Sequence, residues 1–251
     1  MIVQCDRCDT KFEDEYRSTL CPHNAFAAND DNNVFTVHND AYINSGARYD
    51  ADYFLRGKQT GKSLYEDYRW LPNLTIPMCQ AVTNYLGIKK TQTVLDFGCA
   101  RGYMVKALRL LGFDAYGQDV SEWAIGNCDA DVKQHLKLKD KLTHEFDWII
   151  AKDVLEHVQD ADAMVTEMRA HARAGIFVVV PLSSQDGQPY VLTDYELDVT
   201  HIHRLTLASW VRMFLHRGWD VKATYRVPGI KDNHYVTAWE PGDGFIVATR
   251  K

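Results

Sequence analysis

The sequence has no hydrophobic run that approaches the ~20 residues a helix needs to cross a lipid bilayer. Residues 1–15 are polar and carry charges of both signs, which is not the pattern of a signal or transit peptide. These two absences predict a cytoplasmic protein with no membrane partner.

The chain also lacks a surplus of basic residues, since its formal net charge is -6 at pH 7. Proteins that bind phosphate backbones usually present a basic face, because lysine and arginine neutralise the phosphates. The charge therefore disfavours a nucleic-acid partner without excluding one. Internal repeats and low-complexity tracts are missing too, so the composition is that of an ordinary globular protein.

The sequence divides into three regions that differ in residue composition and hydrophobic pattern. Residues 1–45 form a small, polar, cysteine-rich extension, and residues 46–90 are aromatic and predicted to be a helical lid segment. Residues 91–251 alternate strand-like apolar runs with helix-length segments, which predicts an α/β domain with a parallel sheet wrapped by helices. The predicted strands are 93–97, 114–118, 135–138, 146–151, 175–181, 220–226 and 245–250, and the predicted helices are 101–111, 121–128, 161–171 and 207–217.

The most informative motif is VLDFGCARG, which ends the first of these strands and opens a helix. A turn at which the backbone approaches a ligand closely needs residues with little or no side chain, and Gly98, Ala100 and Gly102 meet that need. The next helix directs its first N–H groups toward such a ligand. Asp119 follows at the tip of the second strand, about 20 residues on, where a carboxylate can accept both ribose hydroxyls.

The segments VLDFGCARGYMVKALRLLGFDAYGQDVSEWAI and FDWIIAKDVLEHV resemble two motifs of the class I S-adenosylmethionine-dependent methyltransferases. The resemblance implies a Rossmann-like, seven-stranded, mostly parallel sheet with helices on both faces and an antiparallel last strand. It implies that the glycine turn holds the methionine part of the cofactor, that Asp119 holds the ribose and that Val120 packs on the adenine. The cofactor-binding residues so implied are Asp96, Gly98, Cys99, Ala100, Gly102, Asp119, Val120, Lys152 and Asp153.

Two positions depart from the pattern of that family. Ala100 stands where glycine is more frequent, and its methyl group is tolerable if φ stays negative there. Lys152 places a charge where the fourth strand opens onto the transferred methyl group.

Methyl transfer to a hydroxyl requires alignment of the acceptor and removal of a proton. Histidine titrates near neutral pH, and the cleft of this fold opens at the carboxyl ends of the strands. His157 follows the fourth strand, and His201 and His203 follow the fifth, so these three are the candidate catalytic residues. The alternative is structural: Glu156 and His157 shape the cofactor pocket, while the other imidazoles make structural hydrogen bonds.

The aromatic segment YDADYFLRGKQTGKSLYEDYRW, residues 49–70, precedes the first strand of the sheet. In the family such segments often lie over the cofactor, so Arg56 is a candidate for its carboxylate, and Gly57 and Gly61 would permit hinge motion. An amphipathic helix on the sheet edge is the equally simple alternative. The aromatic residues expected to line an acceptor pocket are Tyr49, Tyr53, Phe54, Tyr65 and Tyr68.

The leading hypothesis is methyl transfer to an oxygen or nitrogen of a polar small molecule, such as a sugar or a nucleotide-linked sugar. One alternative is a nucleic-acid or protein methyltransferase that grips its substrate with the cysteine-rich extension. The run AKDVLEH argues against methylation of DNA amino groups, because such enzymes place an Asn/Asp-Pro-Pro-aromatic run there. A further alternative is a binding module that kept the cofactor site and lost activity.

The cysteine-rich extension carries the spacing of a metal knuckle. Cys5 and Cys8 are separated by two residues, and Cys21 and His23 complete a set of four, which suits tetrahedral zinc. The close spacing of the second pair leaves room for another ligand, such as His38. We expect the zinc to be structural, and the alternative is an arm with free thiols.

We predict that the cysteine-rich extension binds one equivalent of zinc and that Cys5→Ser lowers the zinc content of the purified protein by that equivalent, because a thiolate ligand is removed. Metal analysis by mass spectrometry checks this. A zinc-free wild-type protein, or a Cys5→Ser variant that keeps all its zinc, would contradict the prediction.

Overall fold

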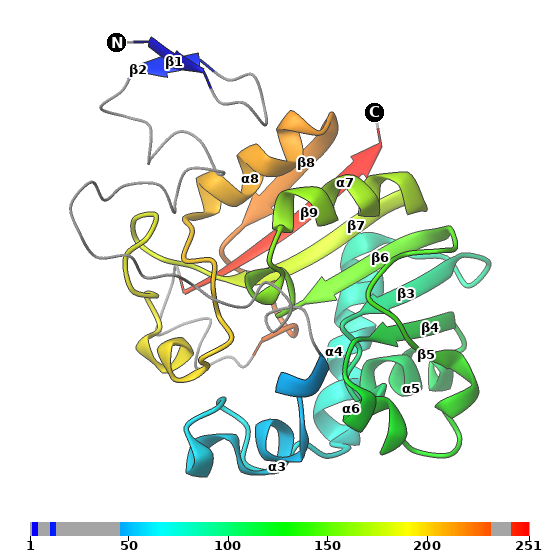
Figure 1. Ribbon diagram of the computed structural model, residues 1–251. Helices are drawn as coiled ribbons and strands as arrows, with labels where there is room; N and C mark the ends of the chain where they lie inside the picture. The colour runs from blue at the N-terminus through cyan, green and yellow to red at the C-terminus, as the bar shows by residue number, and fades with distance from the viewer. Residues whose placement is uncertain (1, 5–10, 14–45, 232–241, 251) are drawn as a thin grey trace.

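The computed structural model describes residues 2–4, 11–13, 46–231 and 242–250 (Figure 1). Near the N-terminus, β1 (Ile2–Gln4) pairs antiparallel with β2 (Lys11–Glu13). The proposed zinc ligands Cys5, Cys8, Cys21 and His23 lie outside the described residues, so the zinc site stays a prediction.

A seven-stranded sheet forms the centre of the molecule, with the order β5-β4-β3-β6-β7-β9-β8 (Figure 1). All neighbours from β5 to β7 pair in parallel, whereas β9 runs antiparallel to both β7 and β8. The predicted sheet, mostly parallel with an antiparallel last strand, is therefore confirmed. The strands are β3 (Thr93–Phe97), β4 (Asp114–Asp119), β5 (Leu136–Leu138), β6 (Phe146–Lys152), β7 (Ala172–Pro181), β8 (Trp219–Thr224) and β9 (Asp243–Arg250).

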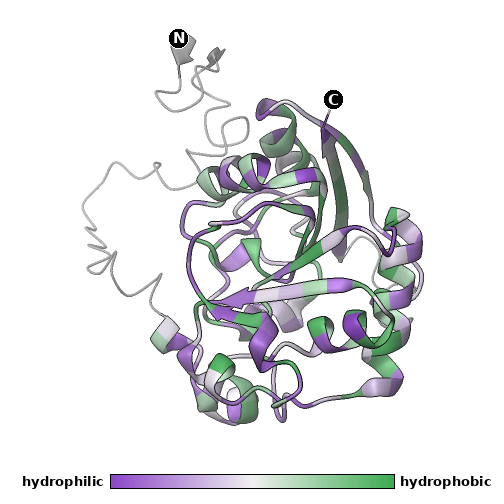
Figure 2. Cartoon of the chain, turned by 90° about the vertical axis from the view of Figure 1, so that its right-hand side faces the viewer, coloured by the Kyte–Doolittle hydropathy of each residue, from purple (hydrophilic) through white to green (hydrophobic). Residues whose placement is uncertain are grey.

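Helices cover both faces of this sheet. One hydrophobic cluster joins the sheet to α7 and α8, and a second joins it to α4 and α5. In Figure 2 both the strands of the sheet and the helices that cover it carry hydrophobic residues. The helices are α3 (Ala51–Thr60), α4 (Pro72–Leu86), α5 (Tyr103–Leu110), α6 (Glu122–Gly126), α7 (Ala161–His171) and α8 (Leu207–His216), with 3-10 turns η3 (Gly46–Arg48), η4 (Lys133–His135), η5 (Leu155–His157) and η6 (Thr193–Leu197).

The central strand β7 shows why the two clusters form. Its apolar residues are fully buried and alternate, so Ile176, Val178 and Val180 enter the cluster with α7 and α8, whereas Phe177 and Val179 enter the other. Side chains of a strand point alternately to opposite faces. A run that is apolar at every position therefore has to lie between two helical layers.

Local signals set several boundaries. Ser121 caps α6, because its Oγ accepts from the N–H of Ala124 at 2.9 Å. The helix expected from residue 101 begins instead at Tyr103, because Gly102 still has φ +76 and belongs to the turn. Among the described residues, no helix combines the length and the apolar character needed to cross a bilayer.

The two helices before the sheet have different surroundings. In α4, Cys79 and Val82 are fully buried in the cluster that also contains Leu108 of α5. In α3, Tyr53 and Phe54 form a separate small cluster with Ala100 and Ala124, next to the glycine turn. The α3 helix therefore packs on Ala100 of the predicted cofactor loop.

We predict that Gly98→Ala destabilises the protein more than Gly61→Ala. Both glycines have positive φ, +77 and +66, so an alanine costs ~1–2 kcal/mol at either position. At Gly98 a Cβ would also lie 2.5 Å from Val154 Cγ2, whereas nothing lies within 4 Å at Gly61. Overpacking adds about 1–3 kcal/mol, which urea unfolding measures, and equal losses for the two variants would contradict this packing.

Candidate functional site

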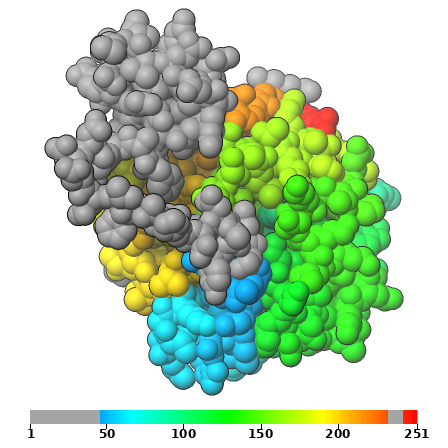
Figure 3. Space-filling model, in the orientation of Figure 1, coloured from blue at the N-terminus to red at the C-terminus, as the bar shows by residue number. Residues whose placement is uncertain are grey.

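A cavity of about 590 Å³ lies at the carboxyl ends of β3, β4 and β6. This volume falls within the range of small-molecule and cofactor sites, and this edge is where ligands bind in parallel α/β sheets. The segment from η3 to α3 closes one side, because Tyr49 O accepts a hydrogen bond from Ser121 Oγ at 2.5 Å. In Figure 3 its blue and cyan surface adjoins the green surface of the sheet domain.

The glycine turn and Asp119 form one end of this cavity. Asp119 Oδ2 accepts from the N–H of Ala100 at 2.7 Å, and its Oδ1 accepts from the N–H of Ser121 at 2.8 Å. Burial raises the pKa of Asp119, and these backbone donors oppose that shift. One carboxylate thus joins the turn after β3 to the turn after β4.

The condition set for Ala100 is not met, because its φ is +48 rather than negative. A left-handed conformation costs an alanine about 1–2 kcal/mol. The hydrogen bond from its N–H to Asp119 is one interaction that holds this geometry. The turn therefore needs a left-handed residue here, which is the physical reason that glycine suits the position.

The predicted cofactor residues fall into two groups. Asp96, Cys99 and Gly102 do not line the cavity: Asp96 and Cys99 are buried, and Gly102 packs closely against Leu136. These three support the turn from behind. The residues that line the cavity are Gly98, Ala100, Asp119, Val120, Lys152 and Asp153.

The charge of Lys152 is neutralised at the end of β6. Its ammonium pairs with Asp153, whose Oδ1 also lies 2.7 Å from Lys231 Nζ. Burial alone would raise the pKa of Asp153, but the two lysines hold it below its usual range. Lys231 Nζ in turn lies 3.4 Å from Asp243, so a chain of half-buried ion pairs connects β6 with β9.

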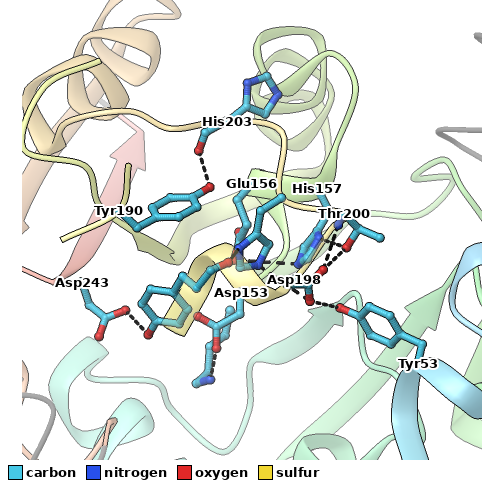
Figure 4. Close-up of polar contacts among 12 residues, drawn as sticks. Tyr53, Asp153, Glu156, His157, Tyr190, Asp198, Thr200, His203 and Asp243 are labelled. Carbon is cyan, nitrogen blue, oxygen red and sulfur yellow. Dashed lines mark hydrogen bonds and ion pairs between the residues drawn. The ribbon is translucent and has the colours of Figure 1, made fainter. Parts of the chain in front are cut away.

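His157 and His201 line the other end of the cavity, with ring centroids 4.6 Å apart. His203 does not line it. Its Nε2–H donates to the carbonyl of Val158 at 2.7 Å, and its own carbonyl accepts from Tyr190 (Figure 4). The structure thus brings two of the three candidate histidines together and gives the third a structural hydrogen bond.

Asp198 organises this end, and the sequence analysis did not select it. Its Oδ1 accepts from the hydroxyl of Thr200 at 2.5 Å, and its Oδ2 accepts from Tyr53 at 2.7 Å (Figure 4). Because the Thr200 proton is committed to Asp198, Thr200 Oγ1 accepts from His157 Nδ1–H at 2.8 Å. His201 Nδ1–H donates to the carbonyl of Tyr195 at 2.8 Å.

Both imidazoles are therefore held in the tautomer that leaves Nε2 unprotonated. Burial lowers the pKa of His157 to about 4, and the neighbouring His201 adds to that shift. Burial also lowers the pKa of His201. Near neutral pH the two rings are uncharged, and each has a free lone pair on Nε2.

Glu156 lies beside these rings and is fully buried. Neither of its carboxyl oxygens has a hydrogen-bond partner among the described residues. Burial, followed by the charge of Asp153, raises its pKa well above the usual range. An unpaired buried carboxyl is costly, so this group requires a proton or a ligand.

Most of the aromatic residues that were predicted to line an acceptor pocket do line the cavity. Tyr68 instead stacks on Tyr103, with ring centroids 5.3 Å apart, and it does not line the cavity. The Arg56 side chain is exposed and paired with Asp52, so it does not face the cavity. The aromatic residues that line the cavity beside α3 are Tyr49, Tyr53, Phe54 and Tyr65.

Comparison with known proteins agrees with this fold. Residues 74–224, more than half of the chain, match a family model described as a methyltransferase domain. The chain belongs to this family, which confirms the resemblance inferred from the sequence.

Individual relatives are more distant. Ubiquinone biosynthesis O-methyltransferase of Methylococcus capsulatus is 28% identical over 130 residues, which are 47% of this chain and 53% of that protein. The chain thus matches about half the length of this curated relative.

Solved structures share the fold. Magnesium protoporphyrin IX methyltransferase from Synechocystis PCC 6803 with bound SAH has a TM-score of 0.53 at 18% identity, over 70% of this chain and 83% of that one. A SAM-dependent methyltransferase from Archaeoglobus fulgidus also has a TM-score of 0.53, at 16% identity, over 70% of this chain and 94% of the other.

We predict that Asp96 makes stability fall as pH rises. Burial, followed by the charge of Asp119, raises its pKa to about 7, whereas an unfolded aspartate has a pKa of about 3.9. The contribution of Asp96 to the free energy of unfolding is therefore fully present below pH ~4. It is lost as the pH rises through about 7, because ionisation of the buried carboxyl disfavours the folded state. Asp96→Asn should remove up to ~4 kcal/mol of this dependence.

Urea unfolding at pH 5 and pH 8 measures this effect, and exposed Asp67 provides the matched Asp67→Asn control. The control should keep the wild-type pH dependence. If Asp96→Asn also keeps it, the assignment is wrong.

Proposed function

We propose that this chain catalyses S-adenosylmethionine-dependent methyl transfer to an oxygen or nitrogen of a small polar molecule. The proposal rests on one observation, a single cavity that is lined at one end by Gly98 and Asp119 and at the other by His157 and His201. The first end has the features of a nucleotide site, and the second has the polar groups that an acceptor needs.

The residues at the first end fit the cofactor. Each Asp119 oxygen accepts one backbone N–H and keeps a lone pair, so the carboxylate can still accept from ribose hydroxyls. Val120 and Val154 provide apolar walls near the turn. When bound, the cofactor supplies a methyl group on a sulfonium, and these residues orient it toward the second end.

The second end fits a small acceptor. Aromatic side chains from the η3–α3 segment, including Tyr49 and Tyr53, form part of its wall and reduce access of water. The Nε2 lone pairs of His157 and His201 can accept a hydrogen bond from the hydroxyl of the methyl acceptor. The matched relative is named an O-methyltransferase, which supports an oxygen acceptor. The hydroxyls of a sugar or of a nucleotide-linked sugar could donate to the same two imidazoles.

The test separates cofactor binding from turnover. We predict that Asp119→Asn weakens binding of S-adenosylhomocysteine about 10-fold or more, because a charged hydrogen-bond acceptor is lost. His201→Ala should leave that affinity within about 2-fold and lower methyl transfer by 10²-fold or more, the usual scale for a lost acid–base or positioning group. Calorimetry and transfer of labelled methyl groups to a panel of hydroxyl and amine acceptors measure the two quantities.

His203→Ala is the matched control, because this imidazole lies nearby but off the cavity. It should retain turnover far better than His201→Ala. Wild-type protein that binds no S-adenosylhomocysteine would end the proposal. Binding without transfer to any acceptor would favour the alternative of an inactive cofactor-binding module.

A further inference from the structure

Three buried or half-buried ligand groups converge at the acceptor end of the cavity. One carboxyl oxygen of Glu156 and one ring nitrogen each of His157 and His201 lie within 4.8 Å of one another. The shortest described approach among them is 4.0 Å, between His157 Nε2 and Glu156 Oε1. All three residues line the cavity, so a ligand could reach them from it.

Among the residues that the structure describes, the hydrogen bonds around this trio leave it without a donor. Thr200 takes the Nδ1 proton of His157, and the Tyr195 carbonyl takes that of His201. Each ring therefore turns an acceptor lone pair toward the cluster, and an ionised Glu156 adds only further acceptors. Three acceptors that face one another need a group placed among them, which can be a metal cation, a proton carried by Glu156 or a donor from a bound ligand.

The surrounding charges favour a cation. The carboxyl groups of Glu156, Asp153, Asp198 and Asp243 belong to this network (Figure 4). Its two lysines, Lys152 and Lys231, pair with Asp153 and Asp243. Ionisation of all of them leaves an excess of two negative charges in the network. A divalent cation at the trio would balance that excess and would give both unpaired Glu156 oxygens a partner.

The ligand types indicate which cations suit the site. Imidazole and carboxylate together suit zinc and other first-row divalent transition metals, whereas Mg²⁺ prefers oxygen ligands and water. A histidine that binds a metal through one ring nitrogen is usually oriented by a hydrogen bond from its other ring nitrogen. In His157 that hydrogen bond runs from Nδ1 to Thr200, which in turn donates to Asp198.

We propose that Glu156, His157 and His201 bind a divalent first-row transition cation at the acceptor end of the cavity. The inference rests on the proposed function for its role. A cation there would take the Nε2 lone pairs of both rings, so the acceptor oxygen would bind the cation instead of the imidazoles and would be polarised by it as a Lewis acid. The open positions of a three-ligand site would receive that oxygen.

The experiment uses the full chain with Cys5→Ser and Cys8→Ser, so that the predicted knuckle does not contribute metal. Metal is first removed from this background by chelation and dialysis. Binding of Zn²⁺ is then measured by calorimetry and binding of Co²⁺ by visible absorption, because the intensity of the Co²⁺ bands reports its coordination number. We expect one equivalent of Zn²⁺ and weaker binding of Mg²⁺. Glu156→Gln and His201→Gln should each weaken Zn²⁺ binding by at least ~100-fold, because even outer partners of metal sites cost 10–100-fold.

His144→Gln is the matched control, since His144 is exposed and does not line the cavity, and it should bind Zn²⁺ like the background. Circular dichroism of each variant identifies any that fail to fold, and two ligand variants guard against one such loss. Absence of Zn²⁺ binding in the folded background, or binding that survives both ligand variants, would overturn the cation site and leave Glu156 as the proton carrier.

Binding of S-adenosylhomocysteine, measured in the same samples, separates the two proposals. If the nucleotide binds and Zn²⁺ does not, only the cation site fails. If Zn²⁺ binds at these residues and the nucleotide does not, the proposed function fails and the site stands.

Discussion

Parallel pairing of β3 with β4 and with β6 is the constraint on which the site depends. It brings the carboxyl ends of these strands to the same edge of the sheet, where the chain must turn away and expose backbone. The Asp119 carboxylate then ties two of these turns together through the N–H groups of Ala100 and Ser121. The strained conformation of Ala100 is held by its hydrogen bond to Asp119 and by its packing with Tyr53 and Phe54.

A second buried carboxylate, Asp198, has the same function at the other end of the cavity. It receives hydrogen bonds from Tyr53 of α3 and from Thr200, and it thereby connects the segment before the sheet with the segment after β7. The orientation of the His157 ring follows from this connection. The acceptor end is thus assembled from three parts of the chain that are distant in sequence, which explains why no short motif describes it.

Much of the fold and one end of the site could be predicted from the sequence. The strand at 93–97 and the helix at 161–171 were placed with their observed bounds, because apolar periodicity and capping residues are local signals. The grouping of Gly98, Ala100 and Asp119 also followed from spacing along two adjacent strands. Asp198 and Tyr195 were missed, since a carboxylate or tyrosine in a loop has no local signal that marks its partners. His201 and His203 could not be separated for the same reason.

The sequence by itself determined the order of strands and helices, the turn that approaches a nucleotide and the family, because these depend on patterns within short stretches of chain. Only the tertiary structure decided which imidazoles share a cavity, that the charge of Lys152 is neutralised, and that the buried Glu156 carboxyl has no hydrogen-bond partner in the described part of the chain. The physical reason is that burial and pairing of polar groups depend on contacts between segments far apart in the chain, and those contacts exist only once the sheet and its covering helices have packed.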